Sequence, residues 1–437
     1  MGKEARCRDR MTSTYTTSCR QVAAPKLLYV TSSFPYGLND VFFEPEVREL
    51  VRQGVDVRPV PVRPRGPLTT ADAESLTLQR PLFDLGIAAA ALAETLRAPA
   101  AVASAFALLF RSPRPSVLLR NVVSFPKALW LARIARSWGA SHIHANWAGP
   151  PSTVALVASR ISGVPWSVTA HASDIAANNL LREKSTSAQF VRFIAAAMMD
   201  RARETAPGID ESRWVLLRFG IDIPEPRARR EALNDPPVLL MAARFDPGKR
   251  QDLLIQATRR LRDDGVEVEV WLAGRGGPLE DEARQLARRL GLDDRIRFRG
   301  AVPRATVLEW LASGQIDAAV LPSDREGIPV ALIEALAHCV PAIGTDVGGI
   351  PELLGDGCGA LVPIGDADAL AAAITRVLDT PELRERIVEA GRARVEREFA
   401  AASVVRRLRE LFEFVDDEDL AAPRSSASDR GRQGSSV

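Results

Sequence analysis

From residue 26 onward, short runs of aliphatic and β-branched residues alternate with longer segments rich in alanine, leucine and arginine. This alternation is typical of parallel strands connected by crossover helices, so we predict an α/β fold. In the first half we expect a helix at Phe42–Gln53, two helical stretches between Phe83 and Ser137, and strands at Leu27–Ser32, Val55–Val60, His142–Ala145 and Trp166–Ala170.

A second series of strands follows residues 222–237, a stretch with four prolines and little apolar content that is typical of an exposed connection. We expect three consecutive helices over about 366–415, strands at Val238–Arg244, Val266–Gly274, Arg295–Arg299 and Asp317–Pro322, and apolar elements at Val340–Gly344 and Ala360–Val362. The pattern therefore predicts two Rossmann-like domains that face each other across a cleft.

The predicted boundaries follow the same changes in composition. We expect a disordered N-terminal extension at 1–25, an N-terminal domain at 26–222 and a C-terminal domain at 223–400. A C-terminal helix at 401–415 precedes a tail at 416–437, which is too polar to bury an apolar core and is predicted to be disordered.

The balance of charge argues against a polyanion as the main partner. Among 437 residues, 57 basic side chains stand against 55 acidic ones, so no broad field favours nucleic acid. The four cysteines form no CxxC pair and no cluster with the four histidines, which indicates neither a zinc site nor a disulfide framework. We therefore predict a cytoplasmic protein without a metal, and the sequence gives no oligomeric state.

Membrane contact is the open question about location. The most apolar stretch, Leu82–Phe110, contains Glu94, Arg97 and Pro99, so it is not a predicted membrane span. Its apolar residues, together with arginines 58, 63 and 65, would suit peripheral contact with a membrane that carries a lipid-linked acceptor. A helix pair that packs into the core is the more ordinary interpretation of the same residues.

The segment from Ser323 to Leu354 carries the most informative chemistry. Gly327 permits close approach of the backbone to a ligand, and Pro329 falls where a first helical position is expected, so free N–H groups would point at the preceding loop. Glu326 and Glu334 would place two carboxylates at different depths along one wall of a cleft, where each can bind a polyol. Either glutamate alone would equally suit a helix-surface charge or a first-turn acid.

Arg244 and Lys249 flank the turn after the first strand of the second half. An arginine at a strand end and a lysine at a helix start converge on one point, which suits a diphosphate. A surface lysine near a helix start is the common alternative.

His171 and Asp174 follow the predicted strand Trp166–Ala170 in the first half. A histidine at the carboxyl end of a parallel strand lies where ligands bind in open α/β sheets. We expect core or supporting roles for His142 and His144, and a packing or capping role for His338.

These motifs together resemble the family-4 retaining glycosyltransferases, which have the two-Rossmann-domain GT-B fold. The resemblance rests on the Glu-x7-Glu segment, the following PAIGTDVGGIPELL and the earlier AARFDPGKRQDLLIQA, and it covers roughly Lys26–Phe414. It implies that Glu326, with the amides of Gly327 and Ile328, contacts the transferred sugar, and that Glu334 holds the nucleotide ribose. By the same resemblance His171 faces the sugar, Arg244 and Lys249 hold the diphosphate, and the loops at Gly274 and Val302 bracket the base.

The first loop, SSFPYGLNDVFFEPE, resembles a subset involved in exopolysaccharide and colanic-acid assembly. That resemblance makes Phe34, Asp40 and Phe42 acceptor-side candidates, and we assign Asp174 to the same side.

The predicted function is a retaining, metal-independent hexosyltransferase without a cofactor. The co-substrate is a UDP- or GDP-linked sugar, and the acceptor is a glycan, a lipid-linked molecule or a small molecule in polysaccharide or glycoconjugate synthesis. Cationic groups fixed at the departing diphosphate would stabilise the transition state more than the ground state. A sugar-nucleotide epimerase or a phosphorylase of the same architecture, and a non-catalytic subunit that binds a sugar nucleotide or glycan, are the alternatives.

Overall fold

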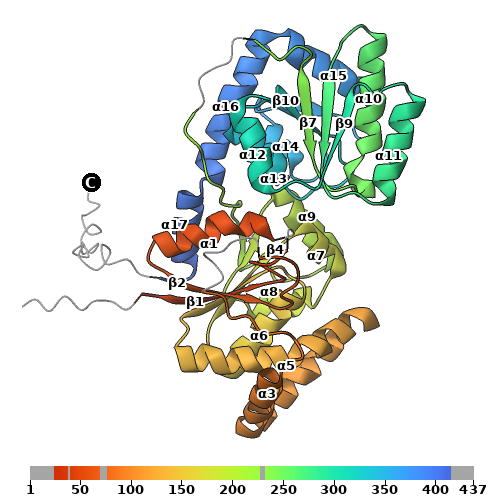
Figure 1. Cartoon of the computed structure of the whole chain (residues 1–437). Coiled ribbons are helices and arrows are strands. Elements are labelled where there is room, and N and C mark those ends of the chain that lie inside the picture. Colours follow the sequence, from red (N-terminus) through yellow and green to blue (C-terminus); the bar gives the residue numbers. More distant parts are fainter. Residues whose placement is uncertain (1–23, 38–39, 69–75, 227–231, 415–437) are drawn as a thin grey trace, which may run out of the picture. The chain divides into compact units, whose positions relative to one another are not determined.

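The computed structural model describes residues 24–37, 40–68, 76–226 and 232–414 (Figure 1). Residues Pro25–Phe414 form one compact unit. The predicted disordered segments at 1–25 and 416–437 lie almost entirely outside the described residues.

The first half is built on a parallel sheet of six strands, in the order β2-β1-β3-β4-β5-β6. The central strands are buried on both faces, as expected for a parallel sheet covered by helices, although β3 and β4 also carry polar residues. The strands are β1 (Lys26–Thr31), β2 (Asp56–Pro61), β3 (His142–Asn146), β4 (Trp166–Ala170), β5 (Val191–Phe193) and β6 (Trp214–Leu216). The sequence did not predict β5 and β6, because three residues are too short for a periodic signal.

Helices cover both faces of this sheet, with α1 on one side and α5 and α6 on the other (Figure 1). Three long helices occupy the region where two were expected, because Pro99 and Pro115 each begin a new helix. The helices are α1 (Glu44–Arg52), α3 (Leu85–Arg97), α4 (Pro99–Leu108), α5 (Pro115–Trp138), α6 (Pro150–Ser162), α7 (Ala172–Ala177), α8 (Leu181–Ser187) and α9 (Ala196–Thr205), with 3-10 turns η1 (Val41–Phe43) and η2 (Leu109–Arg111).

The second half is a parallel sheet of six strands, in the order β12-β11-β10-β7-β8-β9. The strands are β7 (Val238–Ala242), β8 (Glu269–Ala273), β9 (Ile296–Gly300), β10 (Ala318–Leu321), β11 (Ala342–Thr345) and β12 (Ala360–Val362). The first four overlap predicted strands, and β11 and β12 overlap the two predicted apolar elements, so the two-sheet α/β architecture is confirmed.

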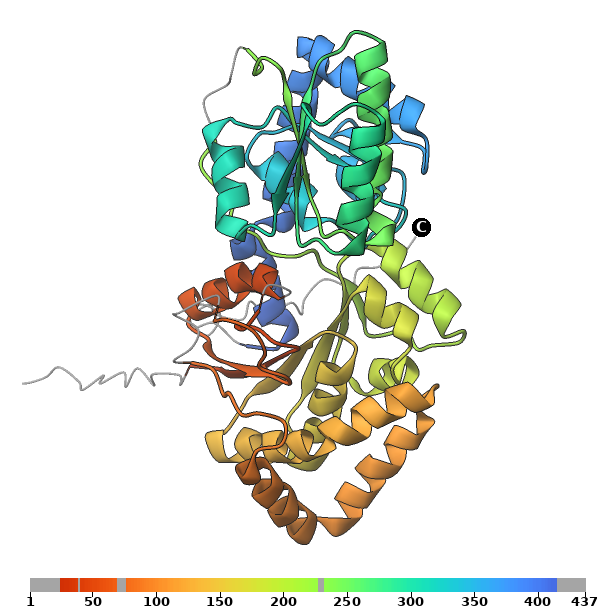
Figure 2. The same cartoon turned by 45° about the vertical axis from the view of Figure 1, so that its right-hand side comes forward.

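Helices also cover the second sheet, as the two views show (Figures 1 and 2). They are α10 (Gln251–Asp263), α11 (Pro278–Arg289), α12 (Arg304–Ser313), α13 (Val330–Ala337), α14 (Ile350–Leu354), α15 (Ala367–Asp379) and α16 (Pro381–Phe399), with the 3-10 turn η3 (Pro247–Lys249). The last helix, α17 (Ala401–Leu411), packs against α1 of the first half. The three consecutive C-terminal helices are therefore confirmed, and the third of them returns to the first sheet.

Among the described helices, none is by itself long and apolar enough to cross a membrane. Two that follow one another, Leu85–Arg97 and Pro99–Arg111, reach the required length and composition only as a pair bent by 113°.

Candidate functional site

The second sheet reverses its strand order between β7 and β10. The chain runs outward from β7 through β8 and β9, then returns to place β10 on the other side of β7. Ligands of open α/β sheets bind outside the carboxyl ends of the strands at such a reversal. The loops that follow β7 and β10 carry Lys249 and Glu326, so both predicted residues come from this position.

Lys249 and Glu326 contact each other directly. The ammonium group of Lys249 donates to Oε1 of Glu326, and the Ser323 hydroxyl donates to the same oxygen at 2.7 Å. The Lys249 side chain is 23% exposed and the Glu326 side chain is 8% exposed. The pair therefore lies at the surface of the loop cluster with little water around the carboxylate, which strengthens its interactions.

Further bonds hold these two loops together. The backbone N–H of Asp324 donates to the carbonyl of Gly248 at 2.9 Å, and the Asp246 side chain accepts from the Gly248 N–H at 3.1 Å. Arg250 bridges Asp252 and Asp324, each at 3.0 Å, and these carboxylates raise its pKa. The position of Lys249 is thus fixed before any ligand arrives.

Arg244 follows β7 at the same edge of the sheet. Its side chain is exposed and makes no ion pair within the described part of the chain, while its carbonyl accepts from the Gln251 side chain at 2.9 Å. A fork of five donors is therefore available beside Lys249 for an incoming anion.

A third loop, after β11, contributes two glycines whose role sequence reasoning missed. The Gly349 N–H donates to the Gly327 carbonyl at 2.6 Å. Gly348 has φ +57°, and a Cβ there would lie 2.0 Å from the Glu326 carbonyl oxygen. Only glycine allows this approach. The pair of adjacent glycines after a strand, which the quoted motif contained, was the available signal.

Glu334 lies on α13 and is buried against a different cation. Arg304 donates to its Oε1 at 2.5 Å. Burial raises the pKa of Glu334, although Arg304 opposes the shift. The two residues line a cavity of about 180 Å³ with Ile221, Asp222, Ile223, Pro224, Leu308, Ala337 and His338.

The sequence predicted Pro329 at the first position of α13, but the structure places it one residue earlier. It is the residue before the helix, with ψ 111°, and Val330 begins the helix. The difference of one residue places the extended turn Ile328–Pro329 directly after the glycine, and it leaves both glutamates on their predicted elements. Ile328 is buried.

The other predicted donor residues lie in close-packed surroundings. A Cβ at Gly274 would lie 2.0 Å from the Ala243 carbonyl oxygen, so the ends of β7 and β8 require glycine there. Val302 packs against the core after β9. Their roles around a nucleotide base stay predictions.

The first sheet reverses between β1 and β3, and the loops there are joined by Asp40. Its Oδ2 accepts from the N–H groups of Ser33 (2.7 Å) and Phe34 (3.2 Å), and its Oδ1 accepts from the Trp147 indole at 3.2 Å. Phe34 and Asp40 are each 1% exposed. Their described contacts are to the protein itself, and their acceptor-side role stays a prediction.

His171 is surrounded by aromatic rings. Its centroid lies 4.2 Å from that of Trp147 and 5.4 Å from that of Phe219, and Phe42 and Phe43 also contact it. Burial lowers the pKa of His171 to about 3, so the ring is neutral at neutral pH. Its Nε2 is buried without a hydrogen-bond partner among the described residues. Such an unpaired atom is costly unless a ligand or a water satisfies it.

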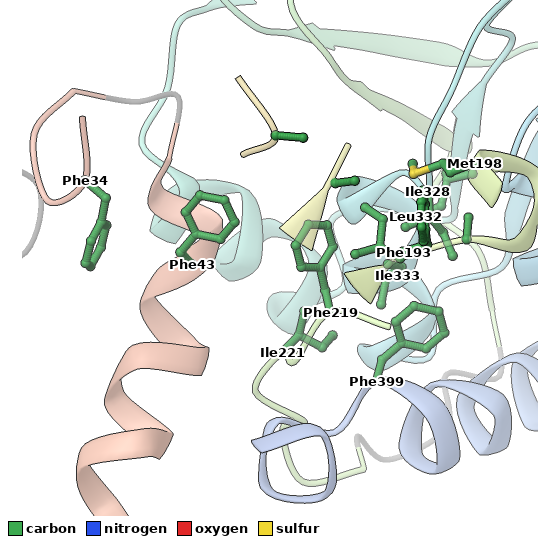
Figure 3. Close-up of a cluster of buried hydrophobic side chains, with 14 of the residues drawn as sticks. Phe34, Phe43, Phe193, Met198, Phe219, Ile221, Ile328, Leu332, Ile333 and Phe399 are labelled. Carbon is green, nitrogen blue, oxygen red and sulfur yellow. The ribbon is translucent and has the colours of Figure 1, made fainter. Parts of the chain in front are cut away.

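The segment after His171 meets the Glu326 loop. A Cβ on Gly327 would lie 2.2 Å from Cε of Met198 and 3.7 Å from Cβ of Ala172. Figure 3 shows Met198 beside Ile328. Gly327 is therefore a point of contact between the two halves, and Ala172, which it meets, directly follows His171 in the chain.

Asp174 and Lys184 hold the loop after β3. Asp174 accepts from the Ala148 N–H at 2.8 Å, and Lys184 donates to the carbonyls of Ala148 (2.7 Å) and Gly149 (3.1 Å). Burial raises the pKa of Asp174 to about 7 and lowers that of Lys184 to about 7. In this structure Asp174 holds the backbone of the loop after β3 through Ala148. Its contact with an acceptor stays a prediction.

Glu352, on α14, is a residue that sequence reasoning missed. Its carboxylate accepts from the N–H groups of Ala196 and Ala197, both at 2.9 Å, and from Arg218 at 2.6 Å. A carboxylate at the positive end of a helix is stabilised by the helix dipole. Glu352 therefore ties the second half to the first turn of α9.

The remaining histidines lie where the sequence placed them. His142 and His144 are fully buried and share the Ser167 hydroxyl, each at 2.7 Å. His338 follows α13 and contacts the Glu334 carbonyl at 2.8 Å, a capping position.

A larger hollow, of about 640 Å³, lies apart from these residues. Its walls include Arg259, Arg260 and the sequence Asp366-Ala367-Asp368. Arg260 pairs with Asp368, and the Asp366 side chain accepts from the Ala369 N–H at 2.8 Å. These side chains therefore already have partners within the protein. Among the described residues, no three His, Cys, Asp or Glu side chains gather into a group suited to a metal ion.

Two parallel sheets of this kind, with the candidate site residues in loops at their carboxyl edges, are typical of the GT-B fold. The crystal structure of Anabaena Alr3699/HepE in complex with UDP and glucose has this fold, with a TM-score of 0.66 and 17% identity. The match covers 90% of this chain and all of that one. The predicted fold class is confirmed.

The family model of group 1 glycosyl transferases matches residues 222–394. Alpha-D-kanosaminyltransferase of Streptomyces kanamyceticus is 30% identical over 291 residues, which is 60% of this chain and 75% of that protein. The chain therefore belongs to the group 1 glycosyl transferase family.

Another relative bears on the predicted subset. The putative colanic acid biosynthesis glycosyltransferase WcaL of Escherichia coli K12 is 34% identical over 218 residues, 48% of this chain and 53% of that protein. The predicted likeness to the colanic-acid type is confirmed. The chain spans about half to three quarters of the length of the curated relatives it matches.

Proposed function

We propose that this protein is a retaining, metal-independent glycosyltransferase. It moves a hexosyl group from a UDP- or GDP-linked sugar to a glycan or lipid-linked acceptor in polysaccharide or glycoconjugate synthesis. Membership of the family supports transfer as the reaction, and the colanic acid relative supports polysaccharide synthesis as its setting. The Alr3699/HepE complex supports a nucleotide-sugar donor. A cytoplasmic location stays part of this proposal.

The observation that carries the proposal is the contact between Lys249 and Glu326 at the reversal of the second sheet. It sets a cation and a carboxylate side by side, with the Arg244 guanidinium exposed at the same edge. A sugar diphosphate presents hydroxyls on one side of the scissile bond and anionic oxygens on the other, so it matches this pairing. The diphosphate binds Arg244 and Lys249, and the sugar hydroxyls bind Glu326.

Cleavage of the donor leaves a diphosphate with an additional negative charge. In this proposal Lys249 and Arg244 meet that charge, and because Lys249 is already held by Glu326 it contributes with little reorganisation. These two cations do the work that a metal ion would otherwise do, which makes the reaction metal-independent.

The proposal gives Glu334 the nucleotide ribose. Its carboxylate lines the 180 Å³ cavity, but Arg304 occupies one of its oxygens. The second oxygen accepts from a ribose hydroxyl in this proposal, and Arg304 opposes the rise in the pKa of Glu334 that burial causes.

Retention of configuration requires attack on the face that the leaving group vacates. A diphosphate oxygen accepts the acceptor's proton, and a neutral His171 is suited to donate or accept a hydrogen bond at the sugar. Because its pKa is about 3, His171 cannot serve as a cation near neutral pH.

The test begins with a thermal-shift panel of nucleoside diphosphates and their sugars. A ligand that binds only the folded protein raises the unfolding midpoint, which identifies the donor nucleotide. The donor is then incubated with candidate acceptors with and without EDTA, and the anomeric configuration of the product is read by NMR. The proposal expects EDTA-resistant transfer with retention. Binding of the nucleotide sugar without turnover across the acceptor panel would instead support a non-catalytic subunit.

A further inference from the structure

The region from residue 83 to residue 119, which spans α3, α4, η2 and the start of α5, exposes an unusual number of large apolar side chains. Ten large hydrophobic residues are exposed among the residues that the structure describes, and six of them fall within 83–119. They are Phe83 (87%), Leu85 (87%), Leu92 (62%), Leu96 (75%), Phe110 (64%) and Leu119 (64%). Figure 2 shows α3 and α4 at the outer edge of the first half.

Helix α3 has two apolar faces, and only one is used for packing. Ile87, Ala90 and Glu94 are buried where the helix packs against α5. Leu85, Leu92 and Leu96 recur at helical spacing on the exposed side, separated by Ala88 and Ala89. A surface helix of a globular protein normally carries polar residues on this side.

Helix α4 follows α3 after a bend of 113° and contains no charged residue. Its sequence, PAAVASAFAL, buries Val102, Ala105 and Leu108 and exposes alanines and one serine. Phe110, in η2, extends the exposed apolar side chains beyond the helix. We call the exposed side of residues 83–110 the α3–α4 surface.

The charge around the α3–α4 surface differs from that of the whole chain. Between residues 76 and 140 there are eight basic side chains and two acidic ones, against 57 and 55 overall. Both acids are already paired, Asp84 with Arg80 and Glu94 with Arg97 and Arg136. Arg114 and Arg120 are exposed, and Arg111 is exposed with a long contact of 3.9 Å to Glu183.

We propose that the α3–α4 surface docks on an anionic lipid bilayer. Its apolar side chains enter the boundary between headgroups and acyl chains, and Arg111, Arg114 and Arg120 contact lipid phosphates. Apolar burial and electrostatic attraction are each marginal alone, and together they give stable peripheral binding. The proposal rests on the proposed function in one respect, since it brings the enzyme to a membrane in which a lipid-linked acceptor would reside.

A second copy of the chain is the competing occupant, and charge disfavours it. In a symmetric dimer the same surface meets itself, so the arginines of one copy would approach those of the other. No unpaired acid lies among residues 76–140 to offset that repulsion. A bilayer rich in phosphatidylglycerol supplies the missing anions.

The test is flotation of the full chain with vesicles, measured together with nucleotide binding. Vesicles of phosphatidylglycerol and phosphatidylethanolamine are compared with phosphatidylcholine alone. The apolar variant is Leu92→Glu with Leu96→Glu, and the charge variant is Arg114→Glu with Arg120→Glu. Ile364→Glu and Arg288→Glu are matched controls, since these side chains are 49% and 69% exposed on the second half.

We expect the wild type and both controls to float with anionic vesicles. Each double variant should lose about tenfold or more in partitioning, and the charge variant should also lose its sensitivity to salt. Failure of the wild type to bind, or equal binding by the double variants, overturns the proposal. Light scattering that shows a dimer broken by Leu92→Glu with Leu96→Glu overturns it in favour of self-association.

Nucleotide binding separates this proposal from the function itself. The double variants should bind the donor nucleotide like the wild type in calorimetry, because none of their residues contacts the Lys249 and Glu326 cluster. Loss of vesicle binding with intact nucleotide affinity therefore supports the docking surface. A chain that floats but binds no nucleotide contradicts the proposed function and leaves the docking surface supported.

Discussion

The two sheets reverse their strand order in the same way, yet the loops at the two reversals carry different chemistry. At the first reversal, Asp40 ties Ser33, Phe34 and Trp147 together and is 1% exposed. At the second, Lys249 and Glu326 form an ion pair that remains partly exposed, and Arg244 extends into solvent. One edge is closed by its own side chains, while the other presents charge to a ligand.

The difference assigns separate tasks to the two halves. Buried hydrogen bonds and aromatic rings in the first half hold His171 and the loop after β3 in one geometry. Partly exposed charges in the second half suit a ligand that arrives and leaves as an anion. Substitutions at the first edge should therefore cost stability, and substitutions at the second should cost activity.

Lys249→Ala is expected to give the largest effect on activity. A variant with normal activity would contradict the division of tasks between the two edges. Removal of one preorganised cation from the departing diphosphate should cost about 2 to 4 kcal/mol of transition-state stabilisation, roughly 30- to 1000-fold in kcat. Steady-state transfer kinetics measure the loss. Lys26→Ala is the matched control, because Lys26 lies at the amino end of β1 and donates to the Trp138 carbonyl. Equal losses in the two variants would remove Lys249 from the chemistry.

Asp40→Ala tests the opposite edge. The change leaves four donors without their acceptor, namely the Ser33 and Phe34 N–H groups, the Ser33 hydroxyl and the Trp147 indole, so we expect a loss of about 3 kcal/mol in the free energy of unfolding. Urea denaturation measures it. Lys249→Ala should lower the same quantity by less than Asp40→Ala does, because the Lys249 side chain is 23% exposed and the Ser323 hydroxyl still donates to the Glu326 carboxylate at 2.7 Å. Comparable destabilisation by both variants would contradict the division of tasks.

The buried histidines should make the first half sensitive to acid. Burial lowers the pKa of His142 to about 3, whereas an unfolded histidine titrates near 6.5. Its contribution to stability is therefore complete above pH 6.5 and is lost as the pH falls toward 3. Between pH 7 and 5 this amounts to about 2 kcal/mol.

His142→Gln isolates that contribution. The difference in unfolding free energy between pH 7 and pH 5 should shrink by about 2 kcal/mol in the variant. His338→Gln, in the second half, is the control, since His338 is only half-buried. An unchanged pH difference in His142→Gln would show that His142 is not buried as a neutral ring.

Glu334→Gln should give the smallest of these effects. It tests whether the second edge binds the nucleotide ribose. It replaces a carboxylate oxygen that would accept from the ribose and weakens the bond from Arg304, so we expect roughly a tenfold loss in nucleotide affinity, about 1.4 kcal/mol. Calorimetric titration with the nucleoside diphosphate measures it. The matched control is Glu309→Gln on α12. Unchanged affinity in Glu334→Gln would remove the ribose assignment.

Strong local signals made much of the fold predictable. The strand Trp166–Ala170 was predicted with its observed bounds, although its sequence, WSVTA, alternates apolar and polar residues. The strands Val191–Phe193 and Trp214–Leu216 were missed, since three residues carry no period. The buried Arg192 also disguises β5, because its guanidinium is satisfied by Glu46, 146 residues earlier in the chain.

The site was predictable where one segment carries it, and less so where distant segments meet. Lys249 and Glu326 were both identified, but their direct contact depends on the neighbouring positions of β7 and β10. The Arg304 partner of Glu334 and the contact of Glu352 with α9 join residues 30 and more than 150 positions apart. No local pattern encodes such pairings, because they follow from the order of strands in a sheet.

The central claim is that the second edge alone holds the donor nucleotide. A crystal structure with the donor nucleoside diphosphate bound tests it most directly. We expect the phosphates within ion-pair distance of Arg244 and Lys249, and the ribose hydroxyls on Glu334. A nucleotide bound at the Asp40 edge, or in the hollow beside Arg260, would contradict the account.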